Sequence, residues 1–354
     1  MNTRYYRNFF AGLLILLFSA ACSRNNNITG NNDGNNGIGN RAPLTEAAGR
    51  DELVTTVALI KKRPNGDIEY LFNERAAGYL VKRDHPSFDA LLRIASAAQE
   101  AKRPVKLLSN LPGELTALTE PTAAETAAYL EWYRSNITFA EPNRRLVVSQ
   151  IDTLRFDLAD VQNWKVFLRC TKTVPDLATA QQIFDYCKQQ TCTFGPTQEQ
   201  PCIPFQFVRD GCFARAHKMR RIIETRFRYC SEKVFSYGYG MTLFVQANLW
   251  GGCCVNWWYH VAPLVRVKVG LRVYCYVIDP GMFTGPVRLS TWLSAQDNTN
   301  CNSNANLSSY SIQPSSAFTP VNANPVTEYT TDNQYTQTNI DLAYYNTQGP
   351  TCTN

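Results

Sequence analysis

The residue best suited to chemistry is Cys212, in the segment DGCFARAHKMRRII at positions 210–223. Asp210 and Gly211 interrupt an apolar run, and apolar residues then recur at helical spacing, which predicts a helix beginning at or near Cys212. The first N–H groups of a helix lack partners within it, and together with the positive end of the helix dipole they favour a thiolate. Cys212 is therefore a candidate nucleophile, and the same N–H groups suit an oxyanion beside its sulfur.

The cysteine count allows one thiol to stay free. The chain has 12 cysteines, and only Cys22 precedes Cys170. The remaining number is odd, so one thiol is left over if all the others pair. Cys202 is expected to be bridged, with Cys192 as a candidate partner. The sequence has no C-x-x-C pair and only three histidines, so a zinc site is not expected.

A thiolate needs a base, and each of the three histidines is a candidate. His217 lies about 140° around the predicted helix from Cys212, so we expect it to point elsewhere, as a surface or packing residue. His85 lies in a polar turn with no special context. His260 lies in a stretch rich in aromatic and β-branched residues, which predicts a strand. The alternative role for His260 is that of a buried core histidine.

Asp279 is the predicted partner of His260. The segments VRVKV and LRVYCYVIDP flank Gly270 and predict two strands of an antiparallel hairpin. With the turn centred between Val269 and Gly270, His260 and Asp279 would face each other across the strands, with Cβ atoms about 5 Å apart. The carboxylate would then accept the imidazole N–H and fix its tautomer. Since Pro280 follows, the alternative is that Asp279 caps a turn.

A cysteine-free part of the chain, from position 45 to 140, precedes these segments and predicts a small α+β module. LVTTVALIKK and DIEYLFN predict strands around the turn RPNGD, and RPVKLLSN predicts another. PSFDALLRIASAAQEAK predicts a helix. EPTAAETAAYLEWYRS predicts a second helix, with Thr122 and Glu125 forming a capping box. The module contains no obvious catalytic constellation.

The N-terminus predicts export. Arg4 and Arg7 precede the apolar run FFAGLLILLF, which falls short of the about 20 residues that span a bilayer, so residues 1–21 are a predicted signal peptide. The ending SAAC resembles the lipobox of bacterial lipoproteins, which makes Cys22 a candidate lipidation site. Residues 22–44 are rich in Asn and Gly and predict a flexible tether. We expect a protein that is lipid-anchored at the bacterial outer membrane or cell surface, or secreted after processing, where disulfides persist.

The bulk composition excludes some classes of protein. The 354 residues, 44% of them apolar, suit folded domains. The net charge is +6, and the basic residues are spread along the chain without a block, so no nucleic-acid partner is expected.

Three segments together resemble a known family. DGCFARAHKMRRII, CCVNWWYHVAPLV and VIDPGMFTGPV are similar, in order and spacing, to the Cys, His and Asp segments of the bacterial protein-glutaminases. These secreted enzymes deamidate glutamine side chains within proteins. TVPDLATAQQIFDYCKQQTC resembles the start of their mature enzyme, so the resemblance runs from about 171 to 291, and the tail after 297 matches poorly.

The resemblance implies an α+β fold like that of papain and transglutaminase, disulfide-rich and preceded by a small α+β prodomain. In that fold a helix with the nucleophile Cys212 packs on an antiparallel sheet, which carries the general acid/base His260 and the orienting residue Asp279. No metal or cofactor takes part. Trp257, Trp258 and Tyr259 are candidate walls of a slot for the glutamine side chain, with core packing as their alternative role.

The family is made as a precursor whose pro-region blocks the cleft, and both predicted helical segments of the N-terminal module weakly resemble that region. We therefore expect an inhibitory prodomain at 45–165, removed by an activating protease, and a catalytic domain at 171–354. Its substrates would be proteins or peptides with exposed glutamine, hydrolysed to glutamate and ammonia through a thioester on Cys212.

Two classes of alternative remain open on the residues alone. A cysteine protease or a transglutaminase would use the same triad, because both also form an acyl-thioester. A non-enzymatic, surface-binding lipoprotein would instead hold Cys212 in a disulfide. The predicted tether and the polar tail from Asn298 favour this second alternative.

Overall fold

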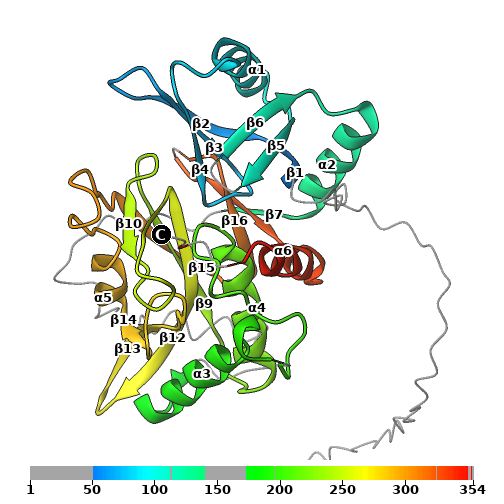
Figure 1. Ribbon diagram of the computed structural model, residues 1–354. Helices are drawn as coiled ribbons and strands as arrows, with labels where there is room; N and C mark the ends of the chain where they lie inside the picture. Colours follow the sequence, from blue (N-terminus) through cyan, green and yellow to red (C-terminus); the bar gives the residue numbers. More distant parts are fainter. Residues whose placement is uncertain are drawn as a thin grey trace, which may run out of the picture. The chain divides into compact units, whose positions relative to one another are not determined.

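The N-terminal module consists of two small antiparallel sheets and two helices (Figure 1). One sheet has the strand order β1-β5-β6, with bounds Asp51–Thr55, Val105–Leu111 and Glu114–Thr119. The other has the order β2-β3-β4, with bounds Val57–Lys62, Ile68–Phe72 and Gly78–Val81. The helices are α1 (Phe88–Glu100) and α2 (Ala123–Ser135). The predicted mixture of helix and sheet is confirmed in this part of the chain.

The structure is a computed structural model that describes residues 51–111, 114–139, 173–195, 197–323, 325–349 and 352. The predicted signal peptide, the tether and Cys22 lie outside the described residues. Within the described ranges, no helix combines the length and the apolar character that a membrane span requires.

Local sequence signals account for most elements of this module. The Thr122 side chain accepts a hydrogen bond from the Glu125 N–H, and the Glu125 carboxylate accepts one from the Thr122 N–H, which confirms the capping box. The segment LVTTVALIKK is not one strand as predicted but two. Thr56 separates them, and its carbonyl accepts a hydrogen bond from the Asn73 N–H. The halves diverge because β1 pairs with β5 whereas β2 pairs with β3.

A larger antiparallel sheet forms the centre of the second part of the chain. Its order is β14-β13-β12-β9-β15, and β8 pairs with β12 in parallel. Strand β12 lies in the interior of this sheet, and its residues 259–265 are all buried, so both of its faces are covered. The bounds are Thr173–Val174 (β8), Glu232–Tyr237 (β9), Tyr259–Val269 (β12), Arg272–Val277 (β13), Val287–Arg288 (β14) and Ser309–Pro314 (β15).

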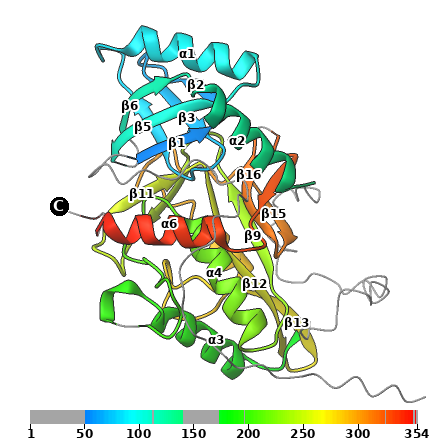
Figure 2. The ribbon, with the colours of Figure 1, turned by 90° about the vertical axis from the view of Figure 1, so that its right-hand side faces the viewer.

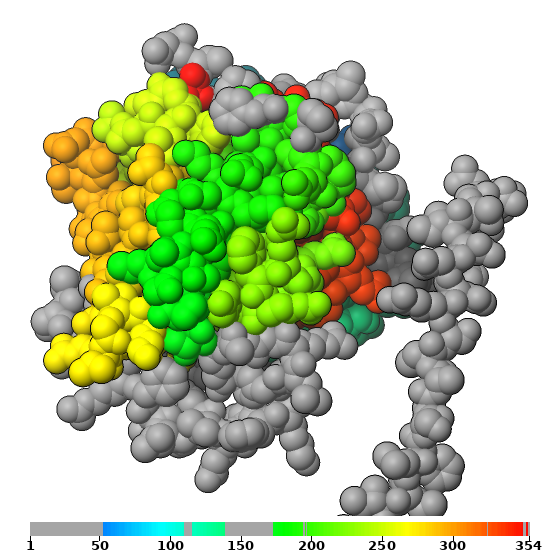
Figure 3. Space-filling view, turned by 90° about the horizontal axis from the view of Figure 1, so that it is seen from below, coloured from blue at the N-terminus to red at the C-terminus, as the bar shows by residue number. Residues whose placement is uncertain are grey.

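Helices cover this sheet. Helix α4 (Cys212–Thr225) packs against β12, and α3 (Leu177–Gln189) packs beside it (Figures 1 and 2). Figure 3 shows the face on which α3, in green, lies next to the yellow residues of the β12–β13 hairpin. The shorter elements are the 3-10 turn η4 (Cys192–Phe194), the paired strands β10 (Leu243–Gln246) and β11 (Cys254–Trp257), and the helix α5 (Leu289–Ser294).

The β12–β13 hairpin forms, but its register differs from the predicted one. Val269 pairs with Arg272, so the turn is centred between Gly270 and Leu271, one position later than predicted. Gly270 adopts a φ of 62°, a left-handed conformation that glycine takes without a steric penalty. The ladder ends at the pair Leu264 and Val277, before it reaches His260. The prediction that His260 and Asp279 are cross-strand partners is therefore wrong.

The C-terminal tail is part of the fold although it matched the family resemblance poorly. It contributes β15 to the central sheet, and then β16 (Ala317–Val321), β17 (Glu328–Thr331) and α6 (Thr336–Thr347). Helix α6 packs against α4, as Figure 2 shows. Strand β17 also pairs with β7 (Ile137–Phe139), which follows α2. The N-terminal module and the tail thus share one three-stranded sheet.

Disulfides hold the second part together. They join Cys192 to Cys202, as the sequence predicted, Cys253 to Cys352 and Cys254 to Cys301. Such bridges persist in oxidising compartments, which fits a protein that acts outside the cytoplasm. Cys212 is not bridged, but neither is Cys187, a buried residue of α3. The expectation of a single spare thiol is therefore wrong.

Candidate active site

Cys212 is the first residue of α4, and its side chain is buried. Gly211, the N-cap, has a φ of 75° and makes no side-chain cap. A Cβ atom at Gly211 would lie 2.5 Å from the Tyr345 ring, so the turn before Cys212 requires glycine both for its positive φ and for lack of space. The structure thus confirms the helix start that the sequence predicted. Since Cys212 is a free thiol, it also removes the alternative in which this residue is bridged.

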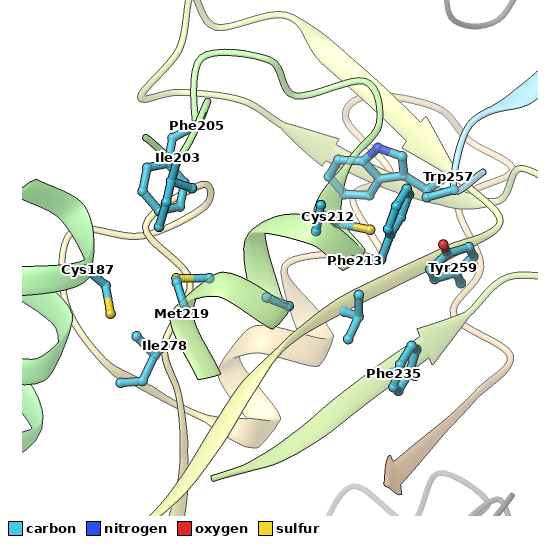
Figure 4. Packing of buried hydrophobic residues seen from close by; sticks show 14 of the residues in the cluster. Cys187, Ile203, Phe205, Cys212, Phe213, Met219, Phe235, Trp257, Tyr259 and Ile278 are labelled. Atoms are coloured by element: carbon cyan, nitrogen blue, oxygen red, sulfur yellow. The ribbon is translucent and has the colours of Figure 1, made fainter. Parts of the chain in front are cut away.

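The thiol of Cys212 faces strand β12, where the Val261 N–H hydrogen-bonds it. Figure 4 shows Cys212 at the end of α4 near Trp257 and Tyr259, whereas Cys187 lies on α3, away from this site. Burial raises the pKa of Cys212 to about 12, although the Arg215 charge and the Val261 N–H oppose the shift. In this arrangement the thiol is therefore protonated at neutral pH.

His260 and Asp279 are in direct contact. His260 Nε2 lies 2.8 Å from Asp279 Oδ2, and both residues are almost fully buried. Because an ionised carboxylate only accepts hydrogen bonds, Nε2 is the donor. Asp279 lies two residues beyond β13, in the turn before Gly281, so the contact comes from the loop and not from the ladder.

Several donors hold the Asp279 carboxylate. Trp292 Nε1 donates to Oδ2 at 2.9 Å, and the Gly281 N–H donates to Oδ1 at 3.2 Å. Burial by itself would raise the pKa of Asp279, but the neighbouring His260, the Trp292 hydrogen bond and the Arg215 charge lower it below the ordinary value of 3.8. Asp279 is therefore ionised at neutral pH and accepts the hydrogen bond of His260 Nε2.

Two tryptophan rings stack with the His260 ring. Trp257 stacks on it with ring centroids 4.5 Å apart, and Trp292 stacks on it at 5.4 Å. The second ring nitrogen, Nδ1, is buried and has no hydrogen-bond partner among the described residues. His260 directly precedes Val261, whose N–H meets the thiol, and its Nδ1 is available to a further hydrogen-bond partner.

The three aromatic residues predicted to wall a substrate slot have different surroundings. Trp257 stacks on His260, and its Nε1 donates to the carbonyls of Val208 and Arg209. Trp258 is fully buried, and its indole donates a hydrogen bond to the N-terminal module, as described next. Tyr259 is fully buried, and its hydroxyl has no partner among the described residues.

A segment of the N-terminal module packs beside the site, and the sequence analysis did not predict which segment this is. The connection between β3 and β4 carries Arg75 and Ala76 into the core that also contains Cys212. The Ala76 N–H donates to Asp210 Oδ1 at 2.9 Å, and the Trp258 N–H donates to the Ala76 carbonyl at 3.2 Å. Trp258 Nε1 donates to the Arg75 carbonyl at 2.6 Å. The only sequence signal is the connection NERAA, in which charged and small residues adjoin.

His217 takes no part in the site, and of its two predicted roles the structure supports packing. It is fully buried, its Nε2 lies 3.0 Å from the Asp332 carbonyl, and Lys233 Nζ lies 2.6 Å from its Nδ1. Burial lowers the pKa of both His217 and Lys233. The pair ties α4 and β9 to the segment after β17. Among the described residues, no group of three or more His, Cys, Asp or Glu side chains has the arrangement of a metal site.

Comparison with known proteins adds an independent finding. A family model described as Glutaminase matches residues 180–296. A crystal structure of pro-protein-glutaminase is similar at 26% identity, covering 85% of this chain and 93% of that chain, with a TM-score of 0.63. A mutant of pro-protein-glutaminase is similar at 26% identity, with coverages of 84% and 92% and a TM-score of 0.62.

The protein-glutaminase of Chryseobacterium proteolyticum is similar at 36% identity. That match covers 52% of this chain and 93% of the other, with a TM-score of 0.45. The comparison with curated protein sequences gave no match.

Proposed function

Because the chain belongs to the protein-glutaminase family and is a protein-glutamine deamidase, we propose that it hydrolyses glutamine side chains of proteins and peptides through a thioester on Cys212. The observation that carries this proposal is the buried His260–Asp279 hydrogen bond beside Cys212 at the start of α4. All three residues fall within the stretch 180–296 that the family model matches.

The reaction follows from these positions. The Cys212 thiol gives its proton to His260 Nδ1, and the thiolate attacks the carboxamide carbon of glutamine. The N–H groups at the start of α4 stabilise the oxyanion. When the C–N bond breaks, the His260 imidazolium protonates the departing ammonia and leaves a γ-glutamyl thioester. His260 then takes a proton from water, the hydroxide attacks the thioester, and the Cys212 thiolate leaves to give glutamate.

Tyr259 is the side chain best placed to meet the substrate carboxamide. Its hydroxyl is buried beside Cys212 and has no partner among the described residues, so a polar group entering the slot would satisfy it. Trp257, in contrast, positions His260 by stacking on its ring.

The N-terminal module acts as an inhibitory pro-region in this proposal. Arg75 and Ala76 are hydrogen-bonded to Asp210 and Trp258, which lie two residues before Cys212 and His260 in the chain. The β2–β3 hairpin adds two contacts, because Lys61 Nζ donates to the Tyr239 carbonyl at 2.7 Å and the Met241 N–H donates to Glu69. A substrate reaches the thiol only after this segment leaves, which calls for an activating protease.

The chain is exported, and anchoring through Cys22 is an expectation from the sequence.

A deamidation assay tests the function. The full chain is incubated with casein before and after limited proteolysis, and ammonia, casein chain length and cross-links are measured. We expect ammonia only from the proteolysed sample, with casein neither cut nor cross-linked. The activating protease is quenched with an inhibitor before casein is added. Shortened casein would then indicate that this chain is itself a protease, and cross-linked casein would indicate a transglutaminase.

Occlusion of the site has a separate signature in the reactivity of Cys212. Since the pKa of the buried thiol is about 12, the precursor at pH 8 contains little thiolate, and alkylation by iodoacetamide should quicken with each pH unit up to that value. Proteolytic activation should raise the rate at pH 8 by roughly a hundredfold or more, because the thiol loses the burial that raises its pKa. Peptide mapping of the label, with Cys212→Ser as the control, checks the site. Equal labelling of both forms would contradict occlusion.

A further inference from the structure

Asp210 is a buried carboxylate next to the nucleophile that the reaction itself does not use. Its Oδ1 accepts hydrogen bonds from the N–H groups of Gly211 (2.8 Å) and Ala76 (2.9 Å). Its Oδ2 accepts one from the Tyr345 hydroxyl at 2.9 Å and lies 3.8 Å from Arg75 Nε. Each oxygen therefore has one partner from the second part of the chain and one from the N-terminal module.

The charge of Asp210 is compensated by the module. Asp210 is fully buried and Arg75 is 1% exposed, so the ion pair between them is closed to solvent. Burial raises the pKa of Asp210, and Arg75 is the first of the groups that oppose this shift. The guanidinium of Arg215, in the second part of the chain, donates to the backbone carbonyls of Phe207 and Asp210. When the module leaves, the carboxylate loses both a backbone donor and its cation.

Two consecutive residues of the connection between β3 and β4, Arg75 and Ala76, are held through their backbone as a bound peptide would be. Three hydrogen bonds bind two consecutive residues: Asp210 accepts the Ala76 N–H, the Trp258 N–H binds the Ala76 carbonyl, and the Trp258 indole binds the Arg75 carbonyl. These contacts involve only the backbone of the ligand, so any peptide can make them. Ala76 is hydrogen-bonded to Asp210, two residues before Cys212, and to Trp258, two residues before His260. We therefore take its position as that of the target glutamine.

We propose that Asp210 is a specificity-determining residue of the activated enzyme, which accepts the backbone N–H of the target glutamine and pairs with a basic side chain on the preceding residue. This inference rests on the proposed function and extends it to the sequence around the glutamine. A substrate with arginine before glutamine restores the cation that the module supplied. Alanine at that position leaves the buried carboxylate uncompensated, and glutamate adds a repelling charge.

Peptides with blocked ends that differ only at the residue before glutamine provide the test. The full chain is activated by limited proteolysis, the protease is quenched, and kcat/KM for ammonia release is measured with arginine, alanine or glutamate at that position. We expect arginine to exceed alanine by about tenfold or more, and glutamate to be the poorest. In Asp210→Asn the ratio of arginine to alanine should fall close to one. Because both peptides are measured on the same preparation, partial unfolding of the variant leaves this ratio unaffected.

A matched control is Asp185→Asn, which removes an exposed carboxylate of α3 that accepts a hydrogen bond from Gln181. This variant should keep the preference for arginine. Two results would overturn the role of Asp210 even though ammonia is still released. One is an equal kcat/KM for the arginine and alanine peptides in the unmutated enzyme, and the other is a preference for arginine that survives in Asp210→Asn. A lack of ammonia from every peptide and from casein would instead overturn the proposed function, and the assignment with it.

Discussion

Replacing Cys212 with serine is expected to lower ammonia release from casein by at least about a thousandfold, because the hydroxyl replaces the nucleophile. Once the burial that raises the pKa of Cys212 is relieved by activation, the N–H groups of the first turn of α4 and the Val261 N–H favour a thiolate. A serine hydroxyl, whose pKa lies far above that of a thiol, gains little from the same groups. The two side chains are nearly the same size, so the buried position should accept serine with little change in packing.

The control for this prediction is Cys187→Ser. Cys187 is also a buried free thiol, but it lies on α3, and burial raises its pKa. This variant should keep the kcat of the folded enzyme and lose only stability, which thermal unfolding measures. If Cys212→Ser deamidated casein at the rate of the unmutated enzyme while Cys187→Ser did not, the nucleophile would have to be reassigned.

Replacing Asp279 with asparagine is expected to lower kcat by about a thousandfold with little change in KM. All three partners of the carboxylate are donors: His260 Nε2, Trp292 Nε1 and the Gly281 N–H. Asparagine offers one acceptor and one NH2 group, so in either orientation a donor faces a donor. The variant therefore loses the charge that stabilises the imidazolium and the contact that sets the tautomer of His260.

Two further measurements sharpen this prediction. Trp292→Phe removes one donor but keeps the carboxylate, so its loss of kcat should be much smaller than that of Asp279→Asn. Because the pKa of Asp279 is already below 3.8, Asp279 stays ionised as the pH falls toward that value. The decline in activity on the acid side should thus come from another group. An Asp279→Asn enzyme with unchanged kcat and an unchanged melting temperature would exclude the orienting role.

Features that depend on neighbours in the chain were predictable from the sequence. The helix start at Cys212, the capping box of Thr122 and Glu125, and the bridge between Cys192 and Cys202 all join residues close in sequence. The stretches around Cys212, His260 and Asp279 also carried the family resemblance, because their motifs are long and nearly contiguous.

Features that depend on distant partners were decided only by the tertiary structure. The His260–Asp279 contact exists, but a turn centred one position later places Asp279 in a loop, where Trp292 and Gly281 hold it. Likewise, the insertion of Arg75 and Ala76 beside Asp210 joins residues 134 positions apart, and no local pattern encodes it. Sequence periodicity reports which residues share a face of a helix or strand. Register and long-range packing depend on which faces meet, and these positioned the carboxylates of this site.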